Sequence, residues 1–269
     1  MKRVIYSLYI DIPREEIDPF DKNILKKGET PMNLRTKQQF AKHYGDLCAC
    51  KEIYANAIGA DFIMFEYDDK FKSYSENLKM QYPYLTMYNI INFYKIHLMY
   101  ELGLKYDEIL FLDFDVVPMK NENFFEAWDL TKGIAVLNNN NKISKIESVT
   151  DTSQTIRSPS SKYFNAQAML FEKGLSTKND VINTGIVGIN KDHLAKLNYF
   201  KDFTENLTLM SRLKNGVGIF PDKVLQYFGW DNETLFSVKL QENNVPVQWL
   251  DNKWHYFLYH QGFIPKETI

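Results

Sequence analysis

The sequence predicts an α/β protein built on a central sheet with crossover connections. Short runs rich in β-branched and aromatic residues alternate with longer amphipathic stretches, a pattern typical of α/β folds. Strands are predicted at residues 4–12, 61–67, 108–117 and 181–190. Helices are predicted at 36–57, at 86–102 with Gly103 as C-cap, and near 192–213, 221–228 and 233–240, before an aromatic segment at 249–259.

The composition predicts a single domain. The chain has 269 residues, of which 45% are hydrophobic and 15% aromatic, so a sizeable core is expected. Four consecutive asparagines open a polar stretch that suggests a loop insertion at about 138–162. A loop of that length is uncommon unless it is functional or disordered, so a lid over an active site and an inert insertion both stay open.

Charge and cysteine content exclude several classes of function. Lysine and arginine total 32 against 34 acidic residues, a formal charge of −2, which predicts no nucleic-acid partner. Cys48 and Cys50 are too close for an ordinary disulfide and too few for structural zinc, which favours a reducing compartment. No run approaches the roughly 20 apolar residues of a membrane span. We therefore expect a soluble cytoplasmic protein, with peripheral membrane contact left open.

A pair of aspartates at the end of a buried strand is the main functional signal. In an extended strand Asp113 and Asp115 would share one face, at the carboxyl edge where open α/β sheets bind ligands. Two adjacent carboxylates need a compensating cation, and oxygen ligands beside a diphosphate suit Mg²⁺ or Mn²⁺. The alternative is that both aspartates only solvate the strand end before Pro118.

Four blocks in a fixed order connect this pair to a known family. They are Phe93-Tyr94-Lys95-Ile96-His97 with the segment at 106–117, then Asn183-Thr184-Gly185, Asp231-Asn232-Glu233-Thr234-Leu235, and His260-Gln261-Gly262 with Lys266. Over about residues 86–266 the chain resembles the glycogenin and lipopolysaccharide galactosyltransferase family, family eight of the retaining glycosyltransferases. The resemblance implies a GT-A fold, the Rossmann-like nucleotide-diphospho-sugar transferase fold with a mixed central sheet flanked by helices.

The resemblance also implies a metal site. It makes Asp113 and Asp115 metal ligands, with Asp113 also near the ribose, and His260 the third ligand, with His255 as the alternative. Lys95 would reach the donor phosphates or sugar, although a solvated helix lysine is the other interpretation. Gly262 and Lys266 would clamp the diphosphate, in a departure from the family's His-x-x-Gly-x-x-Lys pattern.

The remaining substrate contacts are implied in the same way. Asn183 and Gly185 would line the sugar, and Asp231 with Asn232 and Glu233 would face its ring. Asn183 and Asp231 would be the catalytic residues, with Asp231 stabilising charge. A polar turn for the first pair and an N-cap with an acidic first turn for the others are the structural alternatives. Leu8 and Tyr9 would lie near the nucleotide base, on which an aromatic ring could stack.

The implied function is a metal-dependent transfer of sugar from a nucleoside-diphosphate sugar, UDP-linked, to an acceptor hydroxyl with retention. The acceptor would be a glycan, a lipid-linked molecule or a protein, the metal Mn²⁺ or Mg²⁺, and a homodimer stays open. One alternative is an inverting enzyme with Asp231 or Glu233 as base, and another is a non-catalytic sugar-nucleotide scaffold. Nucleotidyl transfer is disfavoured because no glycine-rich phosphate loop follows the first strand.

Overall fold

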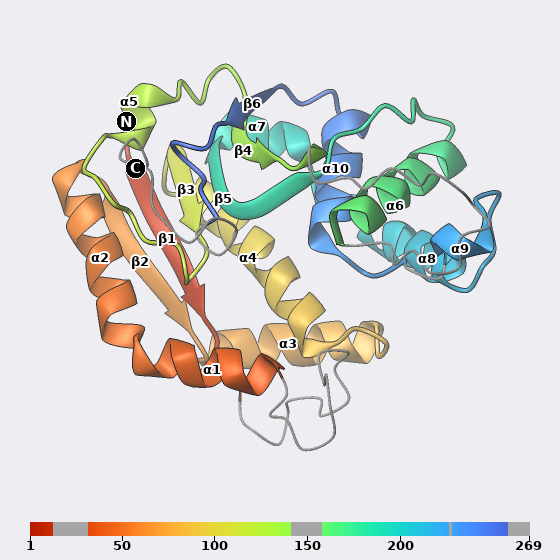
Figure 1. Cartoon of the computed structure of the whole chain (residues 1–269), viewed down its shortest axis with the longest axis horizontal. Helices are drawn as coiled ribbons and strands as arrows, with labels where there is room; N and C mark the ends of the chain where they lie inside the picture. The colour runs from red at the N-terminus through yellow and green to blue at the C-terminus, as the bar shows by residue number, and fades with distance from the viewer. Residues whose placement is uncertain (13–31, 141–157, 226–227, 258–269) are drawn as a thin grey trace.

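The protein is a mixed α/β structure around one six-stranded sheet, as predicted (Figure 1). The computed structural model describes residues 1–12, 32–140, 158–225 and 228–257. The strands are β1 (Arg3–Tyr9), β2 (Asp61–Glu66), β3 (Glu108–Leu112), β4 (Ile134–Asn138), β5 (Ile182–Asn190) and β6 (Val247–Leu250). Their order across the sheet is β2-β1-β3-β5-β4-β6. Because β5 runs antiparallel to both β3 and β4 while the other pairs are parallel, the sheet is mixed.

Helices cover both faces of this sheet. They are α1 (Met32–Lys42), α2 (Tyr44–Ala57), α3 (Asp69–Gln81), α4 (Met87–Gly103), α5 (Phe124–Ala127), α6 (Ser158–Glu172), α7 (Lys191–Leu197), α8 (Phe203–Lys214), α9 (Asp222–Leu225) and α10 (Asn232–Glu242). Figure 1 shows α2 and α5 on one side of the sheet and α4, α6, α8 and α10 on the other.

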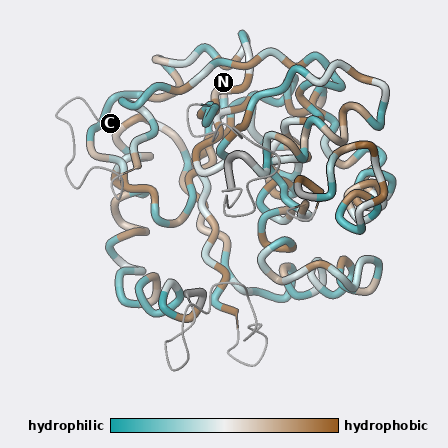
Figure 2. The backbone as a smooth tube through the Cα atoms, turned by 45° about the vertical axis from the view of Figure 1, so that its right-hand side comes forward, coloured by the Kyte–Doolittle hydropathy of each residue, from teal (hydrophilic) through white to brown (hydrophobic). Residues whose placement is uncertain are grey.

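The core has two parts because strand side chains alternate between the faces. The larger part packs against α4, α6, α8 and α10, and the smaller against α2 and α5. The central strands β1 and β3 give Val4, Tyr6, Ile109 and Phe111 to the larger part and Ile5, Leu110 and Leu112 to the smaller. Figure 2 shows hydrophobic residues recurring along the strands, with hydrophilic segments mainly in the helices around them. The described residues thus share one sheet with two covered faces, and a single domain over residues 1–269 stays a prediction.

Helix α4 carries Lys95, one of the predicted site residues. At its start, Thr86 and Asn89 form a reciprocal capping box, which supplies hydrogen-bond partners to backbone N–H groups of the first turn. The predicted C-cap at Gly103 is wrong, since Gly103 is the last helical residue and Leu104 is the cap. A side chain at Gly103 would instead meet Leu194, with a Cβ only 2.9 Å from the Leu194 Cδ2 atom. The glycine therefore serves helix packing.

Several predicted elements end early or divide. The strand predicted at 4–12 stops at Tyr9, and the one predicted at 108–117 stops at Leu112. The helix predicted at 36–57 is interrupted at His43, and the one at 192–213 divides where Asn198 and Asp202 adopt positive φ angles of 45° and 53°. Of the polar insertion predicted at 138–162, residues 158–162 belong to α6 and 141–157 lie outside the described residues.

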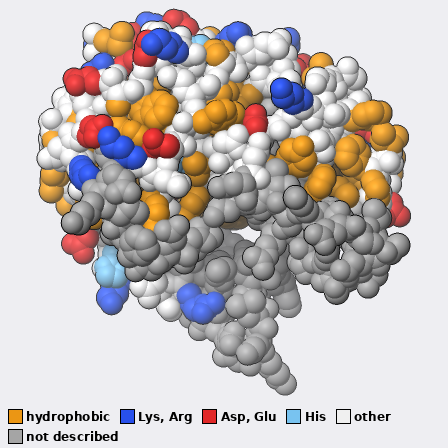
Figure 3. All heavy atoms as spheres, turned by 45° about the horizontal axis from the view of Figure 1, so that its top comes forward, with side chains coloured by type: hydrophobic (Ala, Val, Ile, Leu, Met, Phe, Trp, Pro, Cys, Tyr) orange, Lys and Arg blue, Asp and Glu red, His pale blue; other side chains and the backbone are white. Residues whose placement is uncertain are grey.

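The surface carries both signs of charge. Figure 3 shows lysine and arginine side chains next to aspartate and glutamate on the face it presents, without separation by sign. This mixture agrees with the small formal charge of −2. None of the helices in the described ranges is long and apolar enough to cross a membrane.

Candidate functional site

The Asp113–Asp115 pair lies on a turn at the end of β3. The Asp113 N–H donates to the Gly185 carbonyl at 2.7 Å, and the Val116 N–H closes the turn onto the Asp113 carbonyl at 3.0 Å. The expectation that both carboxylates share one face of a strand is therefore wrong, because the strand has already ended. The Asp113 side chain is 42% exposed and Asp115 is also exposed, so both remain open to a ligand from solvent.

Lys95 approaches this turn from inside the protein. Its side chain is only 5% exposed, and its Nζ lies 3.6 Å from Asp113 Oδ1 and donates to the Thr184 carbonyl at 3.3 Å. Desolvation raises the pKa of Asp113, while the Lys95 charge opposes that rise. The interpretation of Lys95 as a solvated helix lysine is wrong, since its ammonium is buried against the aspartate.

Gly185 makes the close approach of β5 to this turn feasible. A Cβ at this position would lie 3.0 Å from Asp113 Oδ2 and 2.9 Å from Asn183 Oδ1. The Asn183 oxygen accepts the Gly185 N–H at 2.9 Å, which holds the amide beside the carboxylate. Asn183 and Gly185 are thus brought beside Asp113, and their contact with the sugar stays a prediction.

Thr184, on the other side of the same strand, is held by the first turn of α10. Glu233 Oε1 accepts from the Thr184 N–H at 2.6 Å and from its hydroxyl at 3.1 Å. Asn232 Nδ2 donates to the same hydroxyl at 3.1 Å, and Lys162 pairs with Glu233 Oε2. Burial alone would raise the pKa of Glu233, but Lys162 and Lys95 outweigh it and lower the pKa. Glu233 is therefore ionised, with both oxygens engaged.

Asp231 is the N-cap of α10. Its Oδ2 accepts the Thr234 N–H at 3.3 Å and the Thr234 hydroxyl at 3.1 Å, and its Oδ1 accepts the Glu233 N–H at 3.4 Å. Burial raises the pKa of Asp231, and Lys162 opposes that rise. The structural interpretation of Asp231 thus holds, and its catalytic role stays a prediction.

A buried histidine faces the same junction. His255 is 6% exposed, and its Nδ1 has no hydrogen-bond partner among the described residues. Its Cε1 lies 3.6 Å from the point where a Gly185 Cβ would stand, and Asp113 Oδ2 lies 3.0 Å from that point. Burial lowers the pKa of His255 to about 4, so its imidazole is neutral. His260, Gly262 and Lys266 lie outside the described residues, which themselves contain no group of three His, Cys, Asp or Glu side chains that could hold a metal.

An aromatic cluster of Tyr9, Phe40, Tyr44 and Phe114 flanks the turn. The rings of Tyr9 and Phe114 stack with centroids 4.7 Å apart and an interplanar angle of 29°. Leu8 is 9% exposed and belongs to the hydrophobic core, whereas the Tyr9 ring is half-buried. Of the two residues predicted near the base, Tyr9 is the one with an accessible ring.

Sequence reasoning missed three residues around this site. Lys51 is fully buried under the turn and donates to the Phe114 carbonyl at 2.7 Å. Lys162 lies in the stretch predicted to be a loop, so its pairing with Glu233 left no local pattern. Tyr88, in the first turn of α4, is 69% exposed, and the pKa of its phenol is raised by desolvation and by the charge of Asp231.

Comparison with known proteins identifies the class. The family described as glycosyl transferase family 8 matches residues 4–214, more than three-quarters of the chain. The chain belongs to this family and is a glycosyltransferase, and the family's members are retaining enzymes that use nucleotide sugars. Together with the mixed sheet, this match confirms the predicted GT-A fold.

Two further comparisons add less. A galactosyltransferase structure, LgtC in complex with donor and acceptor sugar analogs, aligns with 93% of this chain and 74% of that chain. The two share 12% sequence identity, and the TM-score is 0.42. No curated protein matches the chain in sequence.

Proposed function

We propose that this glycosyltransferase takes its sugar from a UDP-linked donor, with a divalent metal ion held at the Asp113–Asp115 turn, and transfers it to a hydroxyl with retention. The observation that carries the proposal is the junction where Lys95, Asp113 and Gly185 meet. There the buried Lys95 ammonium lies 3.6 Å from the exposed Asp113 carboxylate, and the Asp113 N–H donates to the Gly185 carbonyl at 2.7 Å. Because the Asp113 and Asp115 side chains are exposed, their carboxylates are accessible to a divalent cation from solvent.

The donor set suits Mn²⁺ or Mg²⁺. Asp113 and Asp115 supply exposed carboxylate oxygens, and His255 supplies a neutral imidazole whose Nδ1 is unpaired among the described residues. Carboxylates with one imidazole fit Mn²⁺ well, whereas carboxylates alone fit Mg²⁺. We propose Asp113, Asp115 and His260 as ligands, with His255 as the alternative, because Asp113, Asp115 and His255 do not together form a metal-binding group among the described residues. A bound metal ion would supply positive charge to the departing diphosphate.

The protein residues set the remaining electrostatics. Lys95 holds Asp113 in place and adds a fixed positive charge in a buried setting, where charge acts more strongly than in water. On the aromatic side, the half-buried Tyr9 ring, supported from behind by the buried Phe114, offers a surface for a pyrimidine base.

Retention is favoured by the state of Glu233. An inverting enzyme needs a free carboxylate as general base on the side opposite the leaving group. Glu233 has both oxygens engaged by Thr184 and Lys162, and its pKa is lowered, so it is a weak proton acceptor. Asp231 is occupied in capping α10. The geometry therefore supports transfer on the leaving-group face.

The free thiols of Cys48 and Cys50 support a cytoplasmic location.

A thermal-shift screen tests the donor and metal together. UDP, GDP, CDP and TDP sugars are each titrated with and without Mn²⁺, because a ligand that binds only the folded state raises the melting temperature. We expect the largest rise for a UDP sugar with Mn²⁺. A metal-independent rise, or a preference for another base, would overturn that part of the proposal. The anomeric configuration of the product, read by NMR, tests retention separately, using glycan, lipid-linked and protein acceptors in parallel.

A further inference from the structure

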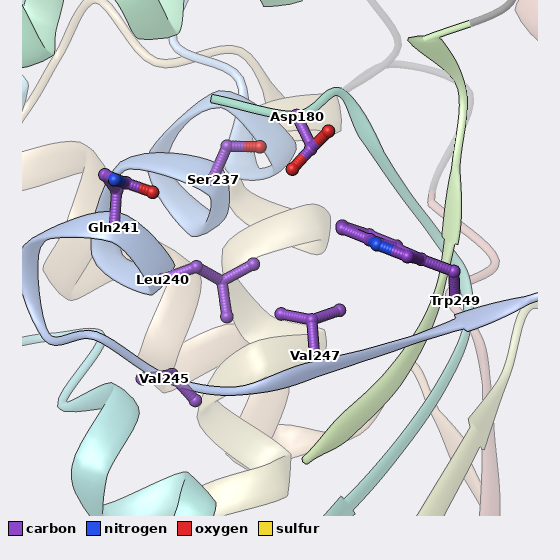
Figure 4. A pocket seen from close by; sticks show the side chains of 7 residues that line it. All are labelled: Asp180, Ser237, Leu240, Gln241, Val245, Val247 and Trp249. Atoms are coloured by element: carbon purple, nitrogen blue, oxygen red, sulfur yellow. The ribbon is translucent and has the colours of Figure 1, made fainter. Parts of the chain in front are cut away.

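A second concave site lies beyond the junction described above, at the β6 edge of the sheet. A pocket with a volume of about 240 Å³ is lined there by residues from α10, β6 and the segment before β5 (Figure 4). The side chains of Asp180, Ser237, Gln241 and Trp249 face a common space in this view, and Leu240 and Val247 form its apolar side. Nothing in the proposed transfer chemistry uses these residues.

The lining combines one open aromatic face with neutral and acidic hydrogen-bonding groups. Trp249 is 39% exposed on the edge strand β6. Asp180 Oδ1 accepts from Asn138 Nδ2 at 3.0 Å and from Asn140 Nδ2 at 2.6 Å, which fixes the direction of the carboxylate. Ser237 adds a hydroxyl and Gln241 an amide, each able to donate and accept.

These groups select a class of ligand. The lining contains a carboxylate and no basic side chain among the described residues, so a phosphate or other anion would be repelled. A quaternary ammonium group is usually held by a cage of several aromatic rings, and this pocket has one. A neutral sugar ring fits both surfaces, because its C–H face can pack on an indole while its hydroxyls bond to carboxylate and amide.

The volume fits the same class. Pockets for drug-sized ligands span roughly 300–1,000 Å³, so a pocket of about 240 Å³ suits a single sugar unit. We propose that this pocket is an accessory subsite that binds one neutral sugar unit of the acceptor. The choice of ligand as part of an acceptor rests on the proposed function, whereas sugar binding by the pocket can be measured without it.

The pocket is connected to the junction by two shared elements. Asp180 precedes Asn183 by three residues, which span at most about 11 Å of chain. Ser237 follows Glu233 by four residues on α10, so both lie on the same helical face about 6 Å apart along the axis. An acceptor of a few sugar units could therefore reach from the junction to the pocket.

Saturation-transfer difference NMR tests the binding. The probes are methyl β-galactopyranoside, methyl β-glucopyranoside and methyl α-mannopyranoside, each with saturating UDP and Mn²⁺ so that the nucleotide site is filled. For at least one probe, we expect a saturation-transfer signal from the protons of one ring face. This signal should fall at least tenfold in Trp249→Ala. Trp249→Phe keeps an aromatic face and should retain part of the signal, and Gln241→Ala should weaken binding severalfold.

The matched control is Ile53→Ala. Ile53 is 63% exposed on α2, which packs on β2 at the opposite edge of the sheet, so its loss should leave the signal unchanged. Melting curves of all variants verify that they are folded. The proposed subsite is overturned if the unmodified protein gives no saturation-transfer signal, or if the signal survives Trp249→Ala. Binding at the pocket in a protein that shows no UDP-sugar turnover would keep the subsite and remove the proposed function.

Discussion

The two sides of the junction between β3 and β5 are built differently. On one side, the Asp113–Asp115 turn leaves its carboxylates exposed, and Asp113 pairs with Lys95. On the other, Thr184, Asn232 and Glu233 form a buried network in which each polar side chain is bonded, with Lys162 closing it from α6. Both sides are rich in charge, but only the first has groups left for a ligand.

This difference separates residues that bind from residues that position. A fully bonded buried network is rigid and costly to disturb, because any lost partner leaves a desolvated group unpaired. An exposed turn with two carboxylates contributes little to the free energy of unfolding, and its carboxylates are available to bind a cation instead. Substitutions in the network should therefore change stability first, and substitutions in the turn should change activity first.

The largest expected effect is loss of turnover in Asp115→Ala. We expect Mn²⁺-dependent hydrolysis of the UDP sugar to fall by about 10³-fold, since charge stabilisation of the departing diphosphate is lost. The melting temperature without metal should change little, because Asp115 is exposed. Asp69→Ala, at an exposed position paired only with Lys72 on the surface, is the control. Unchanged turnover in Asp115→Ala would remove the metal role of the turn.

Glu233→Gln should show the opposite behaviour. The amide oxygen can still accept from Thr184, but the Lys162 ammonium, 25% exposed, loses its partner. Breaking a buried pair on one side costs about 3–5 kcal/mol, and the partial exposure of Lys162 favours the lower end, about 3 kcal/mol. Urea denaturation at pH 7 measures the loss. The double variant Glu233→Gln with Lys162→Met should recover much of it, and a double variant no more stable than the single one would contradict the pairing.

His255 adds a pH dependence that belongs to the binding side. Its pKa is about 4 in the folded protein against an ordinary 6.5, so the unfolded chain binds more protons between these values. The contribution of neutral His255 to the free energy of unfolding is complete above about pH 6.5. Roughly 2–3 kcal/mol of it is lost as the pH falls towards 4. Urea denaturation in EDTA across pH 4–7 measures the slope. His255→Gln should flatten it, and His43→Gln, at a half-exposed site, should not. An unchanged slope in His255→Gln would place the titration elsewhere.

The sequence predicted the elements of the binding side better than the supports. Asp113, Asp115 and Lys95 lie in runs with clear strand and helix patterns, and the structure brings Lys95 and Asp113 together, while the contact of Lys95 with the donor stays a prediction. The turn itself was predicted as strand, because an apolar run does not reveal where pairing stops. Local patterns report on local structure, and the junction depends on the Gly185 backbone, which is distant in the chain.

The supporting residues had no signal that a sequence could give. Lys162 and Lys51 are single lysines whose burial results from tertiary packing, and surface lysines look the same in the chain. Strands β4 and β6 were also missed, since Ile134–Asn138 and Val247–Leu250 are too short for a periodic pattern. For Asp231, Asn232 and Glu233 the resemblance supplied substrate roles, and the structure shows each of them engaged in bonds within the protein.

The smallest expected effect concerns Lys51. It tests whether this lysine shapes the Asp113–Asp115 turn for metal binding or only stabilises the fold. Its ammonium donates to the Phe114 carbonyl at 2.7 Å and to the Leu47 carbonyl at 3.0 Å, over the Phe114 ring. Lys51→Met removes a buried charge along with these bonds, and the two effects offset each other, so the free energy of unfolding should change by about 1 kcal/mol or less. The turn would lose its tether between the two aspartates, and the Mn²⁺ concentration for half-maximal hydrolysis should rise severalfold at unchanged pH. Lys51→Arg keeps a donor and should recover part of that affinity. If Lys51→Met instead lowers the free energy of unfolding by well over 1 kcal/mol and leaves the half-maximal Mn²⁺ concentration unchanged, Lys51 stabilises the fold and does not shape the metal-binding turn.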